Sequence, residues 1–84
     1  YANSLYLRFE VKDKPGVLSE ITKKLARYKI SVKRIIQTPN KKSNSATIVI
    51  ITHKTKEISS KKCISVFKKD KNILKNPTLI RLYN

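Results

Sequence analysis

The sequence predicts a small α+β domain in which two helices cover one face of a four-stranded antiparallel sheet. Three observations support this fold class. Apolar and polar residues alternate over residues 5–12, which is typical of a strand with one buried face. Apolar residues recur at helical spacing over residues 17–28, with Lys23, Lys24 and Arg27 on the opposite face. The remaining segments complete the order β-α-β-β-α-β.

The first helix is expected to begin in the turn at residues 13–16. Pro15 suits the first helical turn, where its missing N–H is no loss. Asp13 can accept hydrogen bonds from the free amides at the helix start. The helix should run for about three to four turns. Its predicted apolar positions are Val17, Leu18, Ile21, Leu25 and Tyr28.

The middle of the chain predicts two strands joined by a turn. Residues 30–38 are rich in β-branched side chains, whereas residues 39–44 are polar and turn-forming. Residues 46–53 form the next predicted strand. Because this strand is apolar on both faces, we expect it to be central in the sheet or covered.

The end of the chain predicts a second helix and a last strand. Thr55 can cap a helix that runs to about residue 70. The apolar positions of this helix are Ile58, Cys63, Ile64 and Phe67. The last strand is predicted at residues 79–83, and Ile73 and Leu74 start it early, before a kink at residues 76–77. Right-handed crossovers put both helices on one face of the sheet, which gives the ferredoxin-like βαββαβ fold.

Length and composition favour one small domain of a longer protein. The chain has 84 residues, no methionine and one cysteine, and we expect a single domain over residues 1–84 that is a fragment. The lone Cys63 cannot form an internal disulfide, which fits a cytoplasmic location. The longest apolar run, residues 48–51, is far shorter than the roughly 20 residues of a membrane span. We therefore expect no membrane partner. Because His53 is the single histidine and Cys63 the single cysteine, we also expect no metal site.

The formal net charge of +15 raises nucleic acid as a partner. Lysines are spread along the whole chain, however, whereas a binding stripe would be clustered. RNA-recognition modules share the predicted topology, but their third strand needs aromatic residues that stack bases. Residues 47–51 contain none. We therefore interpret the charge as compositional, expect no specific nucleic acid, and keep an RNA-binding module as an alternative.

The turn at residues 13–18 is the most informative stretch for function. The first amides of a helix have no partner within the helix, and the helix dipole favours an anion there. Gly16, the only glycine in the chain, allows a ligand to approach the backbone closely. A carboxylate could meet the amides of Gly16, Val17 and Leu18, and Asp13 could bind an ammonium group. These are the two ends of a free α-amino acid, although a helix start without any ligand would have the same sequence features.

Residues 7–18 resemble the opening of an ACT domain, and the pattern of that family continues at Ile21, Leu25 and residues 30–32 and 35–38. Residues 30–37, 46–53 and 79–82 are more narrowly similar to the C-terminal ACT domain of bacterial homoserine dehydrogenases. The family usually has glycine where this chain has Lys29, so the bend there needs a residue with positive φ or a looser turn.

The resemblance implies a homodimer and an effector site. ACT domains commonly pair side by side, join two sheets into one, and bind small effectors, usually amino acids, at the seam. A structural dimerisation domain is the alternative without a ligand. The loop and helix start of one subunit and the second strand of its partner would hold the effector. Carried onto this chain, the loop residues are Asp13, Lys14, Pro15, Gly16, Val17 and Leu18. In the second strand Ser31 matches the family's side-chain contact, with Ile35 and Gln37 as further candidates.

The narrower resemblance also implies the parent enzyme. It predicts L-threonine as the effector, through feedback control of an attached homoserine dehydrogenase that uses NAD(P). The present chain contains no Gly-x-Gly-x-x-Gly motif and no catalytic lysine–acid pair on a dehydrogenase framework. We expect no catalytic residue and no cofactor in this fragment, which would not be an enzyme by itself.

Overall fold

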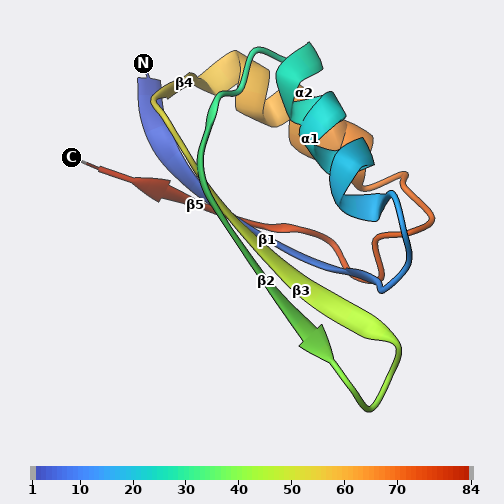
Figure 1. Ribbon diagram of the computed structural model, residues 1–84. Coiled ribbons are helices and arrows are strands. Elements are labelled where there is room, and N and C mark those ends of the chain that lie inside the picture. The colour runs from blue at the N-terminus through green and yellow to red at the C-terminus, as the bar shows by residue number, and fades with distance from the viewer. Residues whose placement is uncertain (1, 84) are drawn as a thin grey trace.

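Two helices lie on one face of an antiparallel sheet in the computed structural model, which describes residues 2–83 (Figure 1). Tyr1 and Asn84, the ends of the predicted domain, lie outside the described residues. The elements in chain order are β1 (Ala2–Lys12), α1 (Val17–Arg27), β2 (Val32–Asn40), β3 (Ser45–Thr52), β4 (Thr55–Lys56), α2 (Glu57–Phe67) and β5 (Thr78–Leu82). The predicted fold class and element order are therefore confirmed, with β4 as a short addition.

The sheet has the strand order expected for this fold. Strand β3 pairs with β1 on one side and with β2 on the other, so it is central as predicted, while β5 pairs with β1. The two-residue strand β4 pairs with the first residues of β1. The segment before β5 also runs along β1, since Ile73 forms a bridge with Val11 and the Leu74 amide donates to the Glu10 carbonyl oxygen at 2.7 Å.

The core lies between the sheet and the helices and follows the predicted periodicities. Alternate residues of β1 and β3 are buried, as are residues of α1 at helical spacing. The buried apolar residues of these elements are Leu5, Leu7, Phe9, Val11, Val17, Ile21, Leu25, Ala46, Ile48 and Ile50. The Phe9 ring meets the Phe67 ring of α2 edge to face, with centroids 4.9 Å apart. This contact ties the sheet to the second helix.

Helix α1 ends in a left-handed turn at Lys29. The Ile30 amide donates to the Leu25 carbonyl oxygen and the Lys29 amide to that of Ala26, each at 2.9 Å. This is the Schellman pattern, and Ile30 and Leu25 are both buried, as the motif favours. Lys29 has φ of 60°, so the expected bend with positive φ is confirmed and a lysine adopts the conformation that glycine adopts most easily.

Replacing Lys29 by glycine should therefore stabilise the domain. Relief of the left-handed strain is expected to raise the free energy of unfolding by up to about 1 kcal/mol, or roughly 4–8 °C in melting temperature. Thermal and urea denaturation measure the change. The matched control is Lys23→Gly in the exposed middle of α1, which should cost about 1 kcal/mol. A Lys29→Gly protein no more stable than the parent would contradict this account.

Both helix starts differ from their predicted positions. The N-cap of α1 is Gly16, in the left-handed region, so Pro15 precedes the helix instead of occupying its first turn. Asp13 is three residues before this cap, and no side chain caps the helix. The expected capping by Asp13 is therefore wrong. The cause is the left-handed Gly16, which delays the first helical residue to Val17.

Helix α2 begins after Lys56, and Thr55 does not cap it. The Thr55 hydroxyl instead donates to the His53 carbonyl oxygen at 3.0 Å, and the Thr52 hydroxyl donates to the same oxygen at 2.8 Å. These bonds hold the turn between β3 and β4. The predicted apolar face of α2 is also partly wrong, because Ile58 is 62 % exposed and Ser60 is buried in addition to Cys63 and Phe67.

Strand β2 is an edge strand that the helices leave uncovered. Its residues from Lys33 to Asn40 are all exposed, and the far ends of β2 and β3 project beyond the helices (Figure 1). Ile35 and Ile36 lie on opposite faces of this strand and are 39 % and 45 % exposed. The outer edge of β2 and its apolar side chains are therefore open to a partner.

An ion pair joins α1 to the segment after α2. Lys24 Nζ lies 2.6 Å from Asp70 Oδ2 and 5.7 Å from the centroid of the Phe67 ring. The other carboxylate oxygen of Asp70 accepts the Asn72 amide at 2.9 Å. Burial raises the pKa of Asp70, but the bonds from Lys24 and Asn72 outweigh it and hold that pKa below its ordinary value.

Acid should weaken this connection. Because the folded-state pKa of Asp70 is lowered, its contribution is present above the unfolded pKa of about 3.9 and is lost as pH falls through the folded value. Asp70→Asn should cost roughly 1–3 kcal/mol at pH 7 and flatten the loss of stability below about pH 4. Urea denaturation at a series of pH values measures both effects. Glu20→Gln, at an exposed pair with Lys23, is the control and should change little. An unchanged acid profile for Asp70→Asn would count against the assignment.

Candidate functional site

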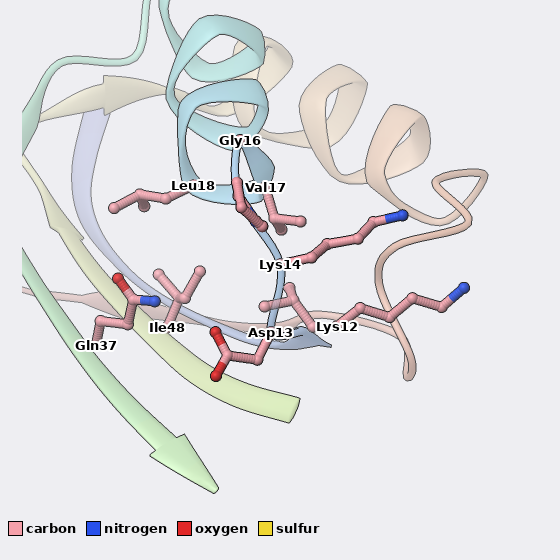
Figure 2. Close-up of a pocket in the computed structure, with 10 residues that line it drawn as sticks. Lys12, Asp13, Lys14, Gly16, Val17, Leu18, Gln37 and Ile48 are labelled. Carbon is pink, nitrogen blue, oxygen red and sulfur yellow. The ribbon is translucent and has the colours of Figure 1, made fainter. Parts of the chain in front are cut away.

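A pocket of about 360 Å³ lies where β1 turns into α1 (Figure 2). Its lining residues are Val11, Lys12, Asp13, Lys14, Pro15, Gly16, Val17, Leu18, Gln37 and Ile48. The structure thus brings together the whole predicted loop and one of the three predicted residues near β2. The volume falls in the range of small-molecule sites, about 300–1,000 Å³.

Backbone hydrogen bonds hold the loop in place. The Lys12 amide donates to the Asn72 carbonyl oxygen and the Asp13 amide to that of Asn44, each at 2.9 Å. Asn44, in the turn between β2 and β3, has φ of 48°. The loop is therefore anchored both to the segment before β5 and to the hairpin turn.

The amides at the start of α1 remain available to an anion. Within residues 2–83, the amides of Gly16 and Leu18 have no acceptor, and the Val17 amide makes only a 3.5 Å contact with the Lys14 carbonyl oxygen. All three residues line the pocket. Since the helix dipole also favours negative charge here, the site suits a carboxylate.

Gly16 contributes both conformation and space. Its φ of 87° lies in the left-handed region, where a side chain is strained. A Cβ placed on Gly16 would meet no atom within 4 Å. The space beside the loop backbone is therefore open, so a bound group can approach it.

Polar side chains at the pocket differ in direction (Figure 2). The side chains of Asp13 and Gln37 lie on the same side of the loop, next to Ile48 on β3. Those of Lys12 and Lys14 extend away from them. The Asp13 carboxylate is exposed and makes no described side-chain hydrogen bond or ion pair. It is thus free to meet an ammonium group, with the Gln37 amide as a further hydrogen-bonding group.

Ser31 and Ile35 do not line this pocket. Ser31 lies just before β2, six residues from Gln37, or roughly 20 Å along an extended strand. Ile35 pairs with buried Ile50 and so lies on the helix side of the sheet, as does Gln37, but it is further along the strand. A single chain therefore brings together seven of the nine predicted site residues.

The pocket is also lined by Val11, Lys12 and Ile48, which the sequence did not predict as site residues. Val11 and Ile48 are 1 % exposed and were expected only as parts of strands. Val11 directly precedes the loop on the inward side of β1, and Ile48 pairs with Phe9 and with Gln37. Their position at the loop end of two neighbouring strands could have predicted that they line the pocket.

The single cysteine and the single histidine lie outside this pocket. Burial raises the pKa of Cys63 to about 12, because the thiol is only 1 % exposed among apolar residues. His53 is exposed, and its backbone rather than its ring makes the described hydrogen bonds. The described part of the chain has no group of three His, Cys, Asp or Glu that could hold a metal. None of its helices is long and apolar enough to cross a membrane.

On the open face of the sheet, the described residues of the two central strands include few aromatic side chains of the kind that RNA-recognition modules use for stacking. Thr47, Val49 and Ile51 of β3 pair with Glu10, Arg8 and Tyr6 of β1 and lie opposite the buried residues. Among these residues of the two central strands, Tyr6 alone is aromatic. Base stacking is worth about 1–3 kcal/mol per base, and these positions offer one aromatic ring for it.

The pocket has the composition of a site for a small zwitterion, held on a βαββαβ domain. The sequence pattern of the ACT domain family matches residues 5–71. This chain therefore belongs to the ACT domain family.

Its relatives include homoserine dehydrogenases. It is 36 % identical over 80 residues to homoserine dehydrogenase of Neisseria gonorrhoeae and 35 % identical over 79 residues to that of Helicobacter pylori. These alignments cover 95 % and 94 % of this chain but only 18 % and 19 % of the relatives. The chain thus spans about a fifth of the curated relatives it matches.

Solved structures also superpose on this chain. A homoserine dehydrogenase from Thiobacillus denitrificans superposes on all of this chain, over 18 % of its own length, with a TM-score of 0.87 and 27 % identity. The regulatory subunit of aspartate kinase from Thermus flavus covers 94 % of the chain, over 52 % of its own length, at a TM-score of 0.64 and 16 % identity, which shows a shared fold.

Proposed function

We propose that this chain is a regulatory domain that binds a free amino acid where two copies of the domain meet. The observation that carries the proposal is the pocket at the start of α1, with three available amides on one side and the free Asp13 carboxylate beside them. The amides receive the α-carboxylate and Asp13 the α-ammonium. Val17, Leu18 and Ile48 surround the side chain of the effector.

The exposed edge of β2 is the proposed contact with a second copy of the domain. Antiparallel pairing of two β2 strands joins the sheets side by side and places the side chains of the partner next to Ile35 and Ile36, which one chain leaves exposed. Such pairing about the middle of β2 brings Ser31 of one copy towards the loop end of the other. In this arrangement Ser31 and Ile35 of one copy would contribute to the site on the other copy.

The relatives support the identity of the controlled enzyme. We propose that the domain acts on an attached homoserine dehydrogenase in the cytoplasm, with L-threonine as the first candidate effector. Gly16 is the only glycine of this chain, so it lacks the glycine-rich turn that cradles a dinucleotide phosphate. NAD(P) belongs to the catalytic part, and this domain would change the populations of its states through differential binding.

Calorimetric titration of the 84-residue chain with threonine, serine, isoleucine, lysine and methionine tests the effector site. We expect saturable binding of threonine with one site per chain and weaker binding of lysine. No heat from any of the five at millimolar concentration would contradict the proposal. A dimer without any binding would instead support the alternative, a structural dimerisation domain.

A further inference from the structure

The edge opposite β2 carries a second surface, between α2 and β5. Strand β5 pairs with β1, and within residues 2–83 its other edge faces no strand. In an antiparallel pair, alternate residues direct their N–H and C=O groups away from the partner. The outer edge of β5 therefore offers unpaired backbone groups to an extended chain.

A groove of about 400 Å³ runs beside this edge on the helix side of the sheet. Leu79 and Arg81 of β5 pair with Leu7 and Leu5, which are buried under the helices, so they face the groove. Ile64 of α2 forms the opposite wall. The groove thus has an apolar centre, formed by Leu79 and Ile64, directly next to an open strand edge.

The charge around the groove is positive. Lys61 of α2 and Lys68, the C-cap residue directly after α2, line it at either side of Ile64, and neither makes a described ion pair. Arg81 is already paired: its Nε donates to both carboxylate oxygens of Glu57 and its Nη2 donates to Oε1, which holds the pKa of that carboxyl below its ordinary value. The charges left for a ligand are therefore two lysines, with no unpaired carboxylate among the lining residues.

The distance between the two lysines determines which peptide sequence fits the groove. Lys61 and Lys68 are seven positions apart, which is about 10 Å along helical backbone. In an extended chain, side chains on one face recur every two residues, and the first and fifth lie roughly 13 Å apart. Lysine side chains are long enough to span the difference. Two acidic residues four apart can thus meet the lysines while the residue midway between them contacts Ile64 and Leu79.

We propose that the β5 edge and this groove bind an extended acidic peptide segment, of the pattern acid-x-apolar-x-acid, as an additional strand of the sheet. Backbone bonds to β5 supply the affinity, and the groove supplies the sequence preference. A second copy of this chain is a poor occupant, because the chain has 20 basic and 5 acidic residues and brings like charge to the lysines. The proposal is independent of the amino-acid site.

A short probe tests it. The peptide acetyl-Thr-Glu-Thr-Val-Thr-Glu-Thr-amide carries the pattern in both chain directions and can be followed by a fluorescent label. We expect saturable binding and slowed amide hydrogen exchange in β5. The same peptide with lysine in place of glutamate should not bind. Of two versions methylated on one or the other set of alternate backbone nitrogens, at least one should bind more weakly, because its methyl groups face β5. Unchanged binding by both methylated versions would overturn strand addition.

Two matched pairs of charge reversals, in and just after α2, test whether the peptide binds in the groove. Lys61→Glu combined with Lys68→Glu should weaken peptide binding by about tenfold or more, since two exposed ion pairs become repulsions. Lys62→Glu combined with Lys69→Glu makes the same change in net charge at exposed lysines outside the groove. Equal weakening by both pairs, or equal binding of a polyuridine strand and the peptide, would show general polyanion attraction and overturn the proposal.

Discussion

Asp13→Asn is expected to weaken amino-acid binding by about 10- to 100-fold while leaving the melting temperature unchanged. The variant keeps the size of the side chain but removes the charge proposed to meet the α-ammonium. A hydrogen bond to a charged partner is worth roughly 1.5–3 kcal/mol, which converts to that range. Stability should persist because Asp13 is exposed and does not cap α1.

Calorimetry with threonine measures this effect, and Glu20→Gln is the matched control. Glu20 is another acidic residue near the start of α1, but it does not line the pocket. Its removal should leave affinity within about twofold, as expected for an exposed charge. Asp13→Asn with parental affinity would show that the ammonium group is held elsewhere.

Phe9→Ala should cause the largest loss of stability. Phe9 is fully buried and its ring contacts Phe67, so truncation removes the contact between the sheet and α2. A buried phenylalanine cut to alanine costs about 3–5 kcal/mol. A domain of 84 residues has a total stability of roughly 4–13 kcal/mol, so the variant should be near its unfolding threshold at room temperature.

Urea denaturation without ligand measures this loss. Tyr83→Ala is the control, since Tyr83 is 80 % exposed and its truncation should change stability by less than about 0.5 kcal/mol. Similar unfolding midpoints for the two variants would contradict the assignment of the core.

The periodic elements were predictable because burial acts on their pattern directly. Strand β1 and helix α1 each have one apolar face, and each packs that face on the same core. The start of α2 was not predictable from local rules, since Thr55 has the right chemistry for a cap. Its hydroxyl bonds the His53 carbonyl oxygen instead, which depends on how β3 and β4 meet.

The site was predictable to the extent that it is continuous in sequence. The loop from Asp13 to Leu18 forms one wall of a pocket because the lone glycine turns the chain there. Gln37 joins it through the pairing of β2 with β3. Ser31 lies too far along β2, and its part in the site remains a prediction that depends on a second copy of the chain.

Sedimentation equilibrium with and without threonine tests the central claim most directly. If the effector binds between two copies, saturating threonine must tighten the dimer, by about 5- to 150-fold for a coupling of 1–3 kcal/mol. The measurement belongs at an ionic strength of about 0.15 M or above, because a net charge of +15 opposes association at low salt. A monomer at every concentration, or a dimer whose dissociation constant is the same with and without threonine, would contradict the account.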